Sequence, residues 1–166
     1  SIRPDMMTMA KCLSSGYLPI SASVINEKIW TVMKDSAHKM GGFGHGLTYS
    51  AHPTCAAVAL ANLEIVEREN LVENAARVGP RLKKRLKEEI GDHPLVGDIR
   101  GEGLMIGVEL VADKETKQEL DLAHKVGPRV MAEGYKNSIL VRALPHRTVL
   151  AMSPPLILTE DNVEEL

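Results

Sequence analysis

The sequence is short of cysteine, of net charge and of long hydrophobic segments, and each shortage narrows the possible functions. Only two cysteines, Cys12 and Cys55, occur among 166 residues, and they show no CxxC spacing. Their number and spacing disfavour a disulfide framework and a zinc site, and favour reduced thiols in a cytoplasmic compartment. The net charge is only -2, so nothing points to a nucleic-acid or membrane-surface partner.

The sequence also lacks a segment that would cross a membrane, and its two ends look like cut points. No apolar run approaches the roughly 20 residues that a membrane-spanning helix needs, and no charged-then-apolar leader opens the chain. The first residue is Ser1 instead of Met, and Thr159 begins an expected helix of only about two turns, too short to be stable alone. We therefore expect a part of a longer protein, so the two ends of this chain do not report on targeting signals or further domains.

The first informative feature of the sequence is a lysine between two apolar runs. Residues 6–10 and 20–25 are predicted to be short buried strands, and Lys11 follows the first of them at the start of a Gly/Ser-containing loop. Strand ends are where α/β proteins gather their sites. Partial burial of Lys11 would favour the neutral amine that attacks a carbonyl group. The alternative is an ordinary lysine whose stem lies on the surface and whose charge stays in water.

Two helices and a Gly-rich segment complete the first 69 residues. Asn26 is expected to cap a helix that runs through Met33. The segment 39–53, KMGGFGHGLTYSAHP, contains glycines that permit close approaches of the backbone. Pro53 suits the first turn of the Ala-rich helix that follows.

The remaining residues predict a helix and then a small α/β domain. Apolar residues recur every three or four positions over 70–90, which is typical of an amphipathic helix, with Asn70 and Glu73 as a capping box and Pro80 as a kink or break. Further elements are expected as follows: a strand over 104–111, a helix over 120–133 stopped by Gly134, two strands over 138–144 and 147–153 that flank Pro145-His146 as a hairpin or as neighbouring strands, and a last strand ending at Leu158.

Four segments in order resemble the class III, pyridoxal-phosphate-dependent aminotransferases. They are RPDMMTMAKCLSSGYLPISASVI, FGHGLTYSAHPTCAAVALANLEIVERE, RGEGLMIGVELVADKET, and ILVRAL followed by VLAMSPPLILTEDNVEEL. The resemblance implies an α/β fold of fold type I, with residues 1–69 as the end of the large cofactor domain, 70–90 as an interdomain helix and 91–166 as most of the small domain.

The resemblance also implies a role for three residues. Lys11 would form the internal aldimine with pyridoxal 5'-phosphate and then move the substrate's proton. Thr48 would bind the cofactor phosphate of the partner subunit in a homodimer. Arg142 would hold a substrate carboxylate through its guanidinium fork.

Each residue also has an ordinary structural interpretation. Thr48 fits a turn, and Arg142 fits a strand edge with its charge in water. Two histidines, His45 and His52, are expected to be turn or capping residues, and no metal site is expected. Two tyrosines, Tyr17 and Tyr49, are candidates for the substrate channel, and Cys12 is expected to pack.

The function implied is transfer of an amino group from an amine or ω-amino acid to a keto acid such as pyruvate. A decarboxylase or an aminomutase of the same fold would share Lys11 and Thr48, and a noncatalytic α/β binding module would use neither. In the family, the phosphate-cradling turn, the ring-stacking aromatic residue and the acidic partner of the pyridinium nitrogen precede Ser1. We therefore expect these 166 residues alone to be inactive.

Overall fold

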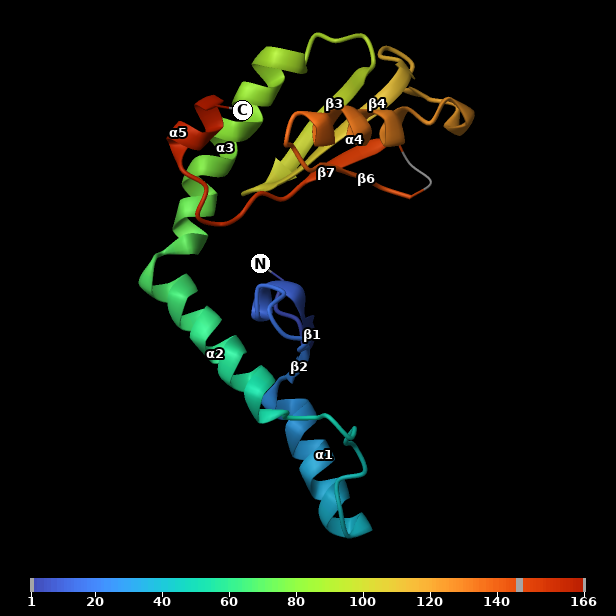
Figure 1. Cartoon of the computed structure of the whole chain (residues 1–166). Helices are drawn as coiled ribbons and strands as arrows, with labels where there is room; N and C mark the ends of the chain where they lie inside the picture. Colours follow the sequence, from blue (N-terminus) through green and yellow to red (C-terminus); the bar gives the residue numbers. More distant parts are fainter. Residues whose placement is uncertain (1, 146–147, 166) are drawn as a thin grey trace. The chain divides into compact units, whose positions relative to one another are not determined.

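The computed structural model describes residues 2–145 and 148–165 and divides the chain into two compact units, Ser1–Glu69 and Asn70–Leu166 (Figure 1). The first unit contains β1 (Met6–Met9), the 3₁₀ helix η1 (Lys11–Leu13), β2 (Ala22–Ile25), α1 (Glu27–Met40) and α2 (Pro53–Arg68). The second contains α3 (Leu71–Ile90), β3 (Val96–Glu102), β4 (Met105–Asp113), β5 (Gln118–Glu119), η2 (Leu122–His124), α4 (Val126–Lys136), β6 (Arg142–Ala143), β7 (Val149–Met152) and α5 (Glu160–Glu165). The chain is therefore mixed α/β, as predicted.

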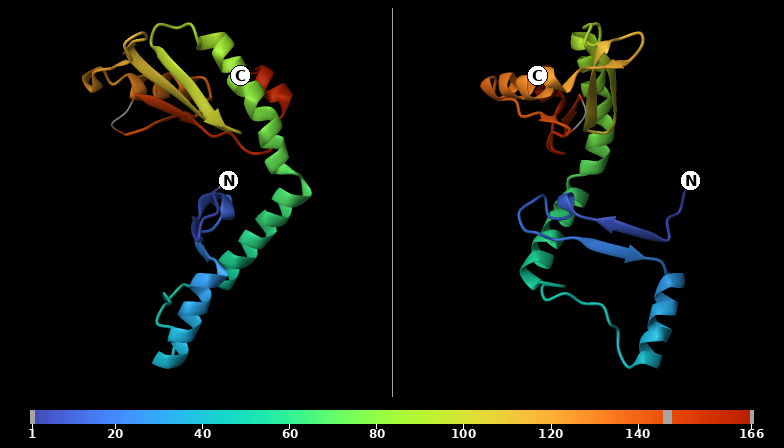
Figure 2. Two further views of the ribbon diagram at one scale, coloured as in Figure 1. Left: turned by 180° about the vertical axis from the view of Figure 1, so that it is seen from behind. Right: turned by 90° about the vertical axis from the view of Figure 1, so that its right-hand side faces the viewer.

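The two strands of the first unit form an antiparallel pair, visible as neighbouring arrows in the right-hand view of Figure 2. Their positions agree with the sequence, but the prediction that they are buried is wrong. Met6 and Met7 are exposed on β1 and Val24 is exposed on β2. The reason is that β1 and β2 pair only with each other among the described residues.

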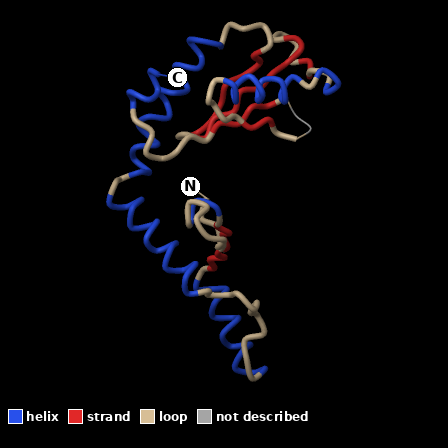
Figure 3. The backbone as a smooth tube through the Cα atoms, viewed as in Figure 1, coloured by secondary structure: helices blue, strands red, loops and turns tan. Residues whose placement is uncertain are grey.

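The helix α1 begins where the sequence predicts and ends later. The Asn26 side chain accepts a hydrogen bond of 3.1 Å from the Ile29 N–H, which satisfies a free donor of the first turn. The helix runs to Met40 and not to Met33, because it stops only at Gly41, whose φ of 78° is left-handed. The loop between α1 and α2, drawn in tan in Figure 3, therefore begins at Gly41, and α2 starts at Pro53 as expected.

The second unit is built on an antiparallel sheet of order β3-β4-β7-β6, with β5 beside β4. Alternate residues of β4 enter the core, so the predicted period of two is confirmed. On the other face, Arg100 of β3 pairs with Asp98 at 3.1 Å and with Glu109 of β4. The buried cluster consists of Val78, Leu82, Val96, Ile99, Leu104, Ile106, Val108, Leu110, Leu150 and Val163.

The amphipathic helix α3 is confirmed, whereas its expected cap and break are not. Asn70 has a left-handed φ of 50° and its side chain makes no capping bond, so the capping box is wrong. The helix continues through Pro80 without a break, and the proline ring lies exposed on the solvent side. Next to it, Gly79 packs so closely on Gly103 that a Cβ there would lie 2.1 Å from the Gly103 carbonyl oxygen.

The region 120–133 is not one helix. Asp121 accepts a 2.8 Å hydrogen bond from the Ala123 N–H and starts the short η2, and Lys125 then adopts a left-handed φ of 50° before α4 begins. Gly134 lies inside α4 instead of ending it. Packing accounts for the glycine, because a Cβ at this position would meet the Ile139 carbonyl oxygen at 2.9 Å. Strands β6 and β7 pair as predicted, shorter than expected, and the turn residue His146 lies outside the described residues. The expected strand ending at Leu158 is loop.

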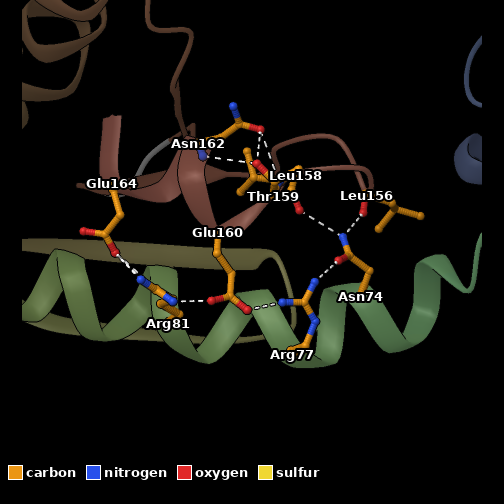
Figure 4. A network of polar contacts seen from close by, with 9 residues as sticks. All are labelled: Asn74, Arg77, Arg81, Leu156, Leu158, Thr159, Glu160, Asn162 and Glu164. Carbon is orange, nitrogen blue, oxygen red and sulfur yellow. Dashed lines mark hydrogen bonds and ion pairs between the residues drawn. The ribbon is translucent and has the colours of Figure 1, made fainter.

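A polar network joins α5 to α3 (Figure 4). Asn74 donates to the carbonyl oxygens of Leu156 and Leu158 at 2.7 and 2.9 Å, and the Asn162 N–H donates to the Thr159 hydroxyl at 3.2 Å, which confirms Thr159 as the N-cap. Further along, Arg81 bonds both Glu160 and Glu164.

Within this network the hydrogen bond from Arg81 lowers the pKa of the Glu164 carboxyl. In the part of the chain that the structure describes, no helix is long and apolar enough to span a bilayer.

Candidate active site

Lys11 follows β1 after one residue, Ala10, and opens η1 with a left-handed φ of 55°. Its side chain is exposed, so the expected partial burial is absent from this chain. Cys12 is exposed as well, and its predicted packing role is wrong. Exposure is what the alternative of an ordinary surface lysine predicts, and it leaves the Lys11 amine accessible from solvent.

An open depression of about 360 Å³ lies beside Lys11. It is formed where the end of β1 faces the start of β2, and its lining combines hydroxyl groups with small side chains and the lysine. The lining residues are Thr8, Met9, Ala10, Lys11, Ser21, Ala22 and Ser23.

The turn that carries Lys11 is held by two polar side chains that sequence reasoning missed. Asn62 of α2 donates to the Cys12 and Leu13 carbonyl oxygens at 2.8 and 3.4 Å and accepts from the Ser15 hydroxyl at 2.6 Å. Ser14, only 2% exposed, donates through its hydroxyl to the Leu18 carbonyl oxygen at 2.5 Å. The one signal for Asn62 in the sequence is a polar amide within an otherwise Ala-rich and apolar stretch of helix.

Thr48 lies in the exposed loop between α1 and α2. Around it, the Leu47 N–H donates to the Ser50 hydroxyl and the Ser50 N–H to the Leu47 carbonyl, both at 2.9 Å, and these bonds shape the turn. No hydrogen bond among residues 2–145 and 148–165 uses the Thr48 hydroxyl or N–H. Thr48 therefore presents two free donors, although it is not among the residues that line the depression at Lys11.

The two tyrosine candidates of the first unit are also exposed. Tyr17 and Tyr49 are each 81% exposed. The ring of Tyr49 contacts that of His52 edge to face, with centroids 6.1 Å apart, and His52 occupies the N-cap position of α2 without a capping side-chain bond. The described residues contain no group of three or more metal-binding side chains.

Arg142 belongs to the second unit, where it starts β6 and pairs with Ala151 of β7. It is exposed, and the ion pairs between described residues do not include it. A guanidinium on an edge strand without a carboxylate partner fits a carboxylate brought by a ligand.

Comparison with known proteins decides the family. Residues 1–166 match the model of the family "Aminotransferase class-III". The chain belongs to the class-III aminotransferases.

Individual relatives agree with this assignment. The chain is 45% identical to an uncharacterised aminotransferase of Sinorhizobium fredii, aligned over 99% of this chain and 35% of that protein. It is 40% identical to the diaminobutyrate--2-oxoglutarate transaminase of Halomonas elongata, over 99% of this chain and 35% of the relative. The chain thus spans about a third of the length of these curated relatives.

Solved structures show the same fold. A transaminase obtained by ancestral reconstruction superposes with a TM-score of 0.94 at 48% identity, over 99% of this chain and 36% of its own. The ω-transaminase of Pseudomonas jessenii, solved in complex with PMP, superposes with a TM-score of 0.90 at 41% identity. The match covers 98% of this chain and 35% of that transaminase. The α/β fold is therefore that of the fold-type-I pyridoxal-phosphate-dependent transaminases.

The residues of this chain fit such a cofactor, which carries an aldehyde and a phosphate. Lys11 supplies an exposed amine beside a depression lined with hydroxyl groups. Thr48 supplies a hydroxyl and an N–H that are free among the described residues, which are the donors that a phosphate accepts from.

Proposed function

We propose that the protein containing this chain transfers an amino group from an amine or ω-amino acid to a keto acid such as pyruvate. The observation that carries the proposal is the exposed amine of Lys11 at the strand end, beside its open depression, in a chain that matches the aminotransferase family from end to end. Relatives such as the diaminobutyrate--2-oxoglutarate transaminase of Halomonas elongata support an amino donor and a keto acid as substrates.

Three residues take part in this proposal. The Lys11 amine would hold pyridoxal phosphate at its aldehyde group and would carry the substrate's proton. Thr48 donates to the phosphate in the site of a partner subunit, which makes a homodimer the active form, and Arg142 binds a substrate carboxylate. When bound, the cofactor supplies a conjugated ring that accepts the electrons of the bond being broken.

The arrangement of the whole protein is part of the same proposal. Residues 1–69 would end the large domain, 70–90 would form the interdomain helix and 91–166 would form most of the small domain; the division at Glu69 supports this. Two free thiols, one of them exposed, support a cytoplasmic location. Because the chain spans about a third of its relatives, we expect the 166 residues alone to show no transamination.

The test is an absorbance spectrum of the full-length protein with pyridoxal phosphate, for wild type, Lys11→Ala and Lys28→Ala. Lys28 is an exposed lysine on α1 and serves as the matched control. We expect a visible band in the wild type and in Lys28→Ala that bleaches when an amine donor is added, and no such band in Lys11→Ala. Equal bands in all three proteins would refute the assignment of Lys11.

A further inference from the structure

The side chain of Asn62 ties the middle of α2 to the turn behind Lys11. Its three hydrogen bonds reach residues 47 to 50 positions earlier in the chain, at Cys12, Leu13 and Ser15. In two of the three bonds the partner is a backbone carbonyl oxygen, which requires a donor, and in the third the Ser15 hydroxyl donates to the Asn62 side-chain oxygen. The side-chain amide is therefore the group needed at this position, and a carboxylate of the same size would face the two carbonyls without a proton to offer.

The turn needs such support because its backbone is unusual. Lys11 and Ser15 have left-handed φ angles of 55° and 48°, and neither is glycine. Residues with a Cβ occupy this region only when the surroundings hold them there. On one side the turn is held by Ser14, whose buried hydroxyl donates to Leu18, and on the other side by Asn62.

These bonds fix the backbone and leave the reactive side chain free. None of them involves the Lys11 amine, which is exposed. The direction in which the amine leaves the turn is set by the left-handed backbone of Lys11, and the adjacent carbonyl, that of Cys12, is the one that Asn62 binds at 2.8 Å. Asn62 thereby acts on Lys11 through the main chain.

We propose that Asn62 is a positioning residue that holds Lys11 in the conformation in which its amine meets the cofactor aldehyde. This rests on the proposed function of Lys11. In the step concerned, the lysine nitrogen forms a double bond to the aldehyde carbon, and the aldehyde oxygen leaves as water. Without Asn62 the turn relaxes, and Lys11 visits the left-handed conformation only a small part of the time.

The experiment compares Asn62→Asp and Asn62→Ala with Asn74→Asp in the full-length protein. Asn74 is a matched control because its amide also donates to two backbone carbonyls, those of Leu156 and Leu158, in the second unit. The cofactor-free protein is mixed with saturating pyridoxal phosphate, and borohydride traps the linkage at successive times. Peptide mapping then gives the rate at Lys11, and the folded fraction and the total bound cofactor are measured in parallel.

We expect both Asn62 variants to form the linkage about tenfold more slowly per folded molecule, with total bound cofactor unchanged at saturation. Asn74→Asp should stay within about twofold of the wild type, because it disturbs only the second unit. Hydrogen exchange without cofactor should quicken over residues 10–18 in the Asn62 variants alone. Ser15→Ala, a change at an exposed residue, removes one of the three bonds and should give an intermediate rate, so a variant remains if the others fail to fold.

Two results would overturn the inference, and they are distinguishable. If the wild type links at Lys11 but the Asn62 and Ser15 variants link as fast as Asn74→Asp, then Asn62 does not position the lysine and the proposed function stands. If the wild type forms no linkage at Lys11, the proposed function fails, and the positioning role fails with it.

Discussion

Gly79 is the position at which the close packing of α3 on the β3–β4 turn is tested most directly. The change is Gly79→Ala, which adds a single methyl group. Its Cβ would lie 2.1 Å from the Gly103 carbonyl oxygen, whereas ordinary contact begins at 3.4 Å, so the helix and the turn would have to separate by about 1.3 Å. Both partners at this contact are backbone, so no side-chain rotation can relieve it.

Two opposing effects set the size of the change. Alanine is a better helix former than glycine, which stabilises α3 by about 1 kcal/mol. Against this, a gap of more than about 1 Å forfeits roughly half of the dispersion attraction across the interface. The side chains that lose it are Val78 and Leu82, both fully or almost fully buried and each worth about 2 kcal/mol. Half of the attraction of these two side chains is about 2 kcal/mol. With overpacking strain of about 1–3 kcal/mol added and about 1 kcal/mol of helix propensity subtracted, we expect a net loss of about 2–4 kcal/mol.

The assay is equilibrium urea unfolding. The dependence of the free energy of unfolding on urea concentration must be the same in each protein for their stabilities to be compared. Gly107→Ala is the control, because a Cβ there meets Val149 at an ordinary 3.5 Å. It should change the free energy of unfolding by less than about 1 kcal/mol. If Gly79→Ala is instead about 1 kcal/mol more stable than the wild type, helix propensity alone governs this position and the packing argument is refuted.

Two further predictions concern the attachment of α5. Val163→Ala removes two methyl groups from a fully buried side chain and should lower the free energy of unfolding in urea by about 2 kcal/mol. Val72→Ala, at an exposed site on α3, should change it by less than about 0.5 kcal/mol. Equal effects of the two changes would contradict the assigned core. The bond from Arg81 lowers the pKa of Glu164, so the stability that this carboxylate contributes should be present at pH 7. It should be lost as the pH falls below the unfolded value of about 4.3 and through the lowered folded pKa; a stability difference between wild type and Glu164→Gln that stays constant as the pH is lowered through this range would contradict this.

The elements that could be predicted from the sequence are those in which burial repeats with a fixed period. The helix α3 and the strand β4 each have one buried and one solvated side, so the spacing of their apolar residues reports the structure directly. The strand β3 was missed because Gly97 and Gly101 interrupt its pattern, although Gly97 is itself buried against Val111. The predicted end of α4 was wrong for a similar reason. Gly134 suggests a helix stop, but packing inside α4 requires the glycine there.

For the candidate site, the sequence motifs located Lys11 but not its surroundings. Its place after β1 follows from a local pattern, and the structure confirms it. The contact with Asn62 joins positions about 50 residues apart and leaves no periodic trace. The exposure of Lys11 was also missed, because a short apolar strand does not tell how many layers cover it.

The strand order of the second unit has a consequence for synthesis on the ribosome. β4 follows β3 after a turn of two residues, so the two strands can pair as soon as they emerge. The other edge of β4 over Ile106–Glu109 is paired by β7, which begins only at Val149. At about 5–20 residues per second, the ribosome needs roughly 2–7 s for that stretch. During this interval the nascent chain has an open strand edge with buried-type residues beside it, which is a site for wrong pairing with other chains. Chaperone binding to the nascent protein is therefore expected to be strongest after β4 has emerged and to fall once β7 has followed.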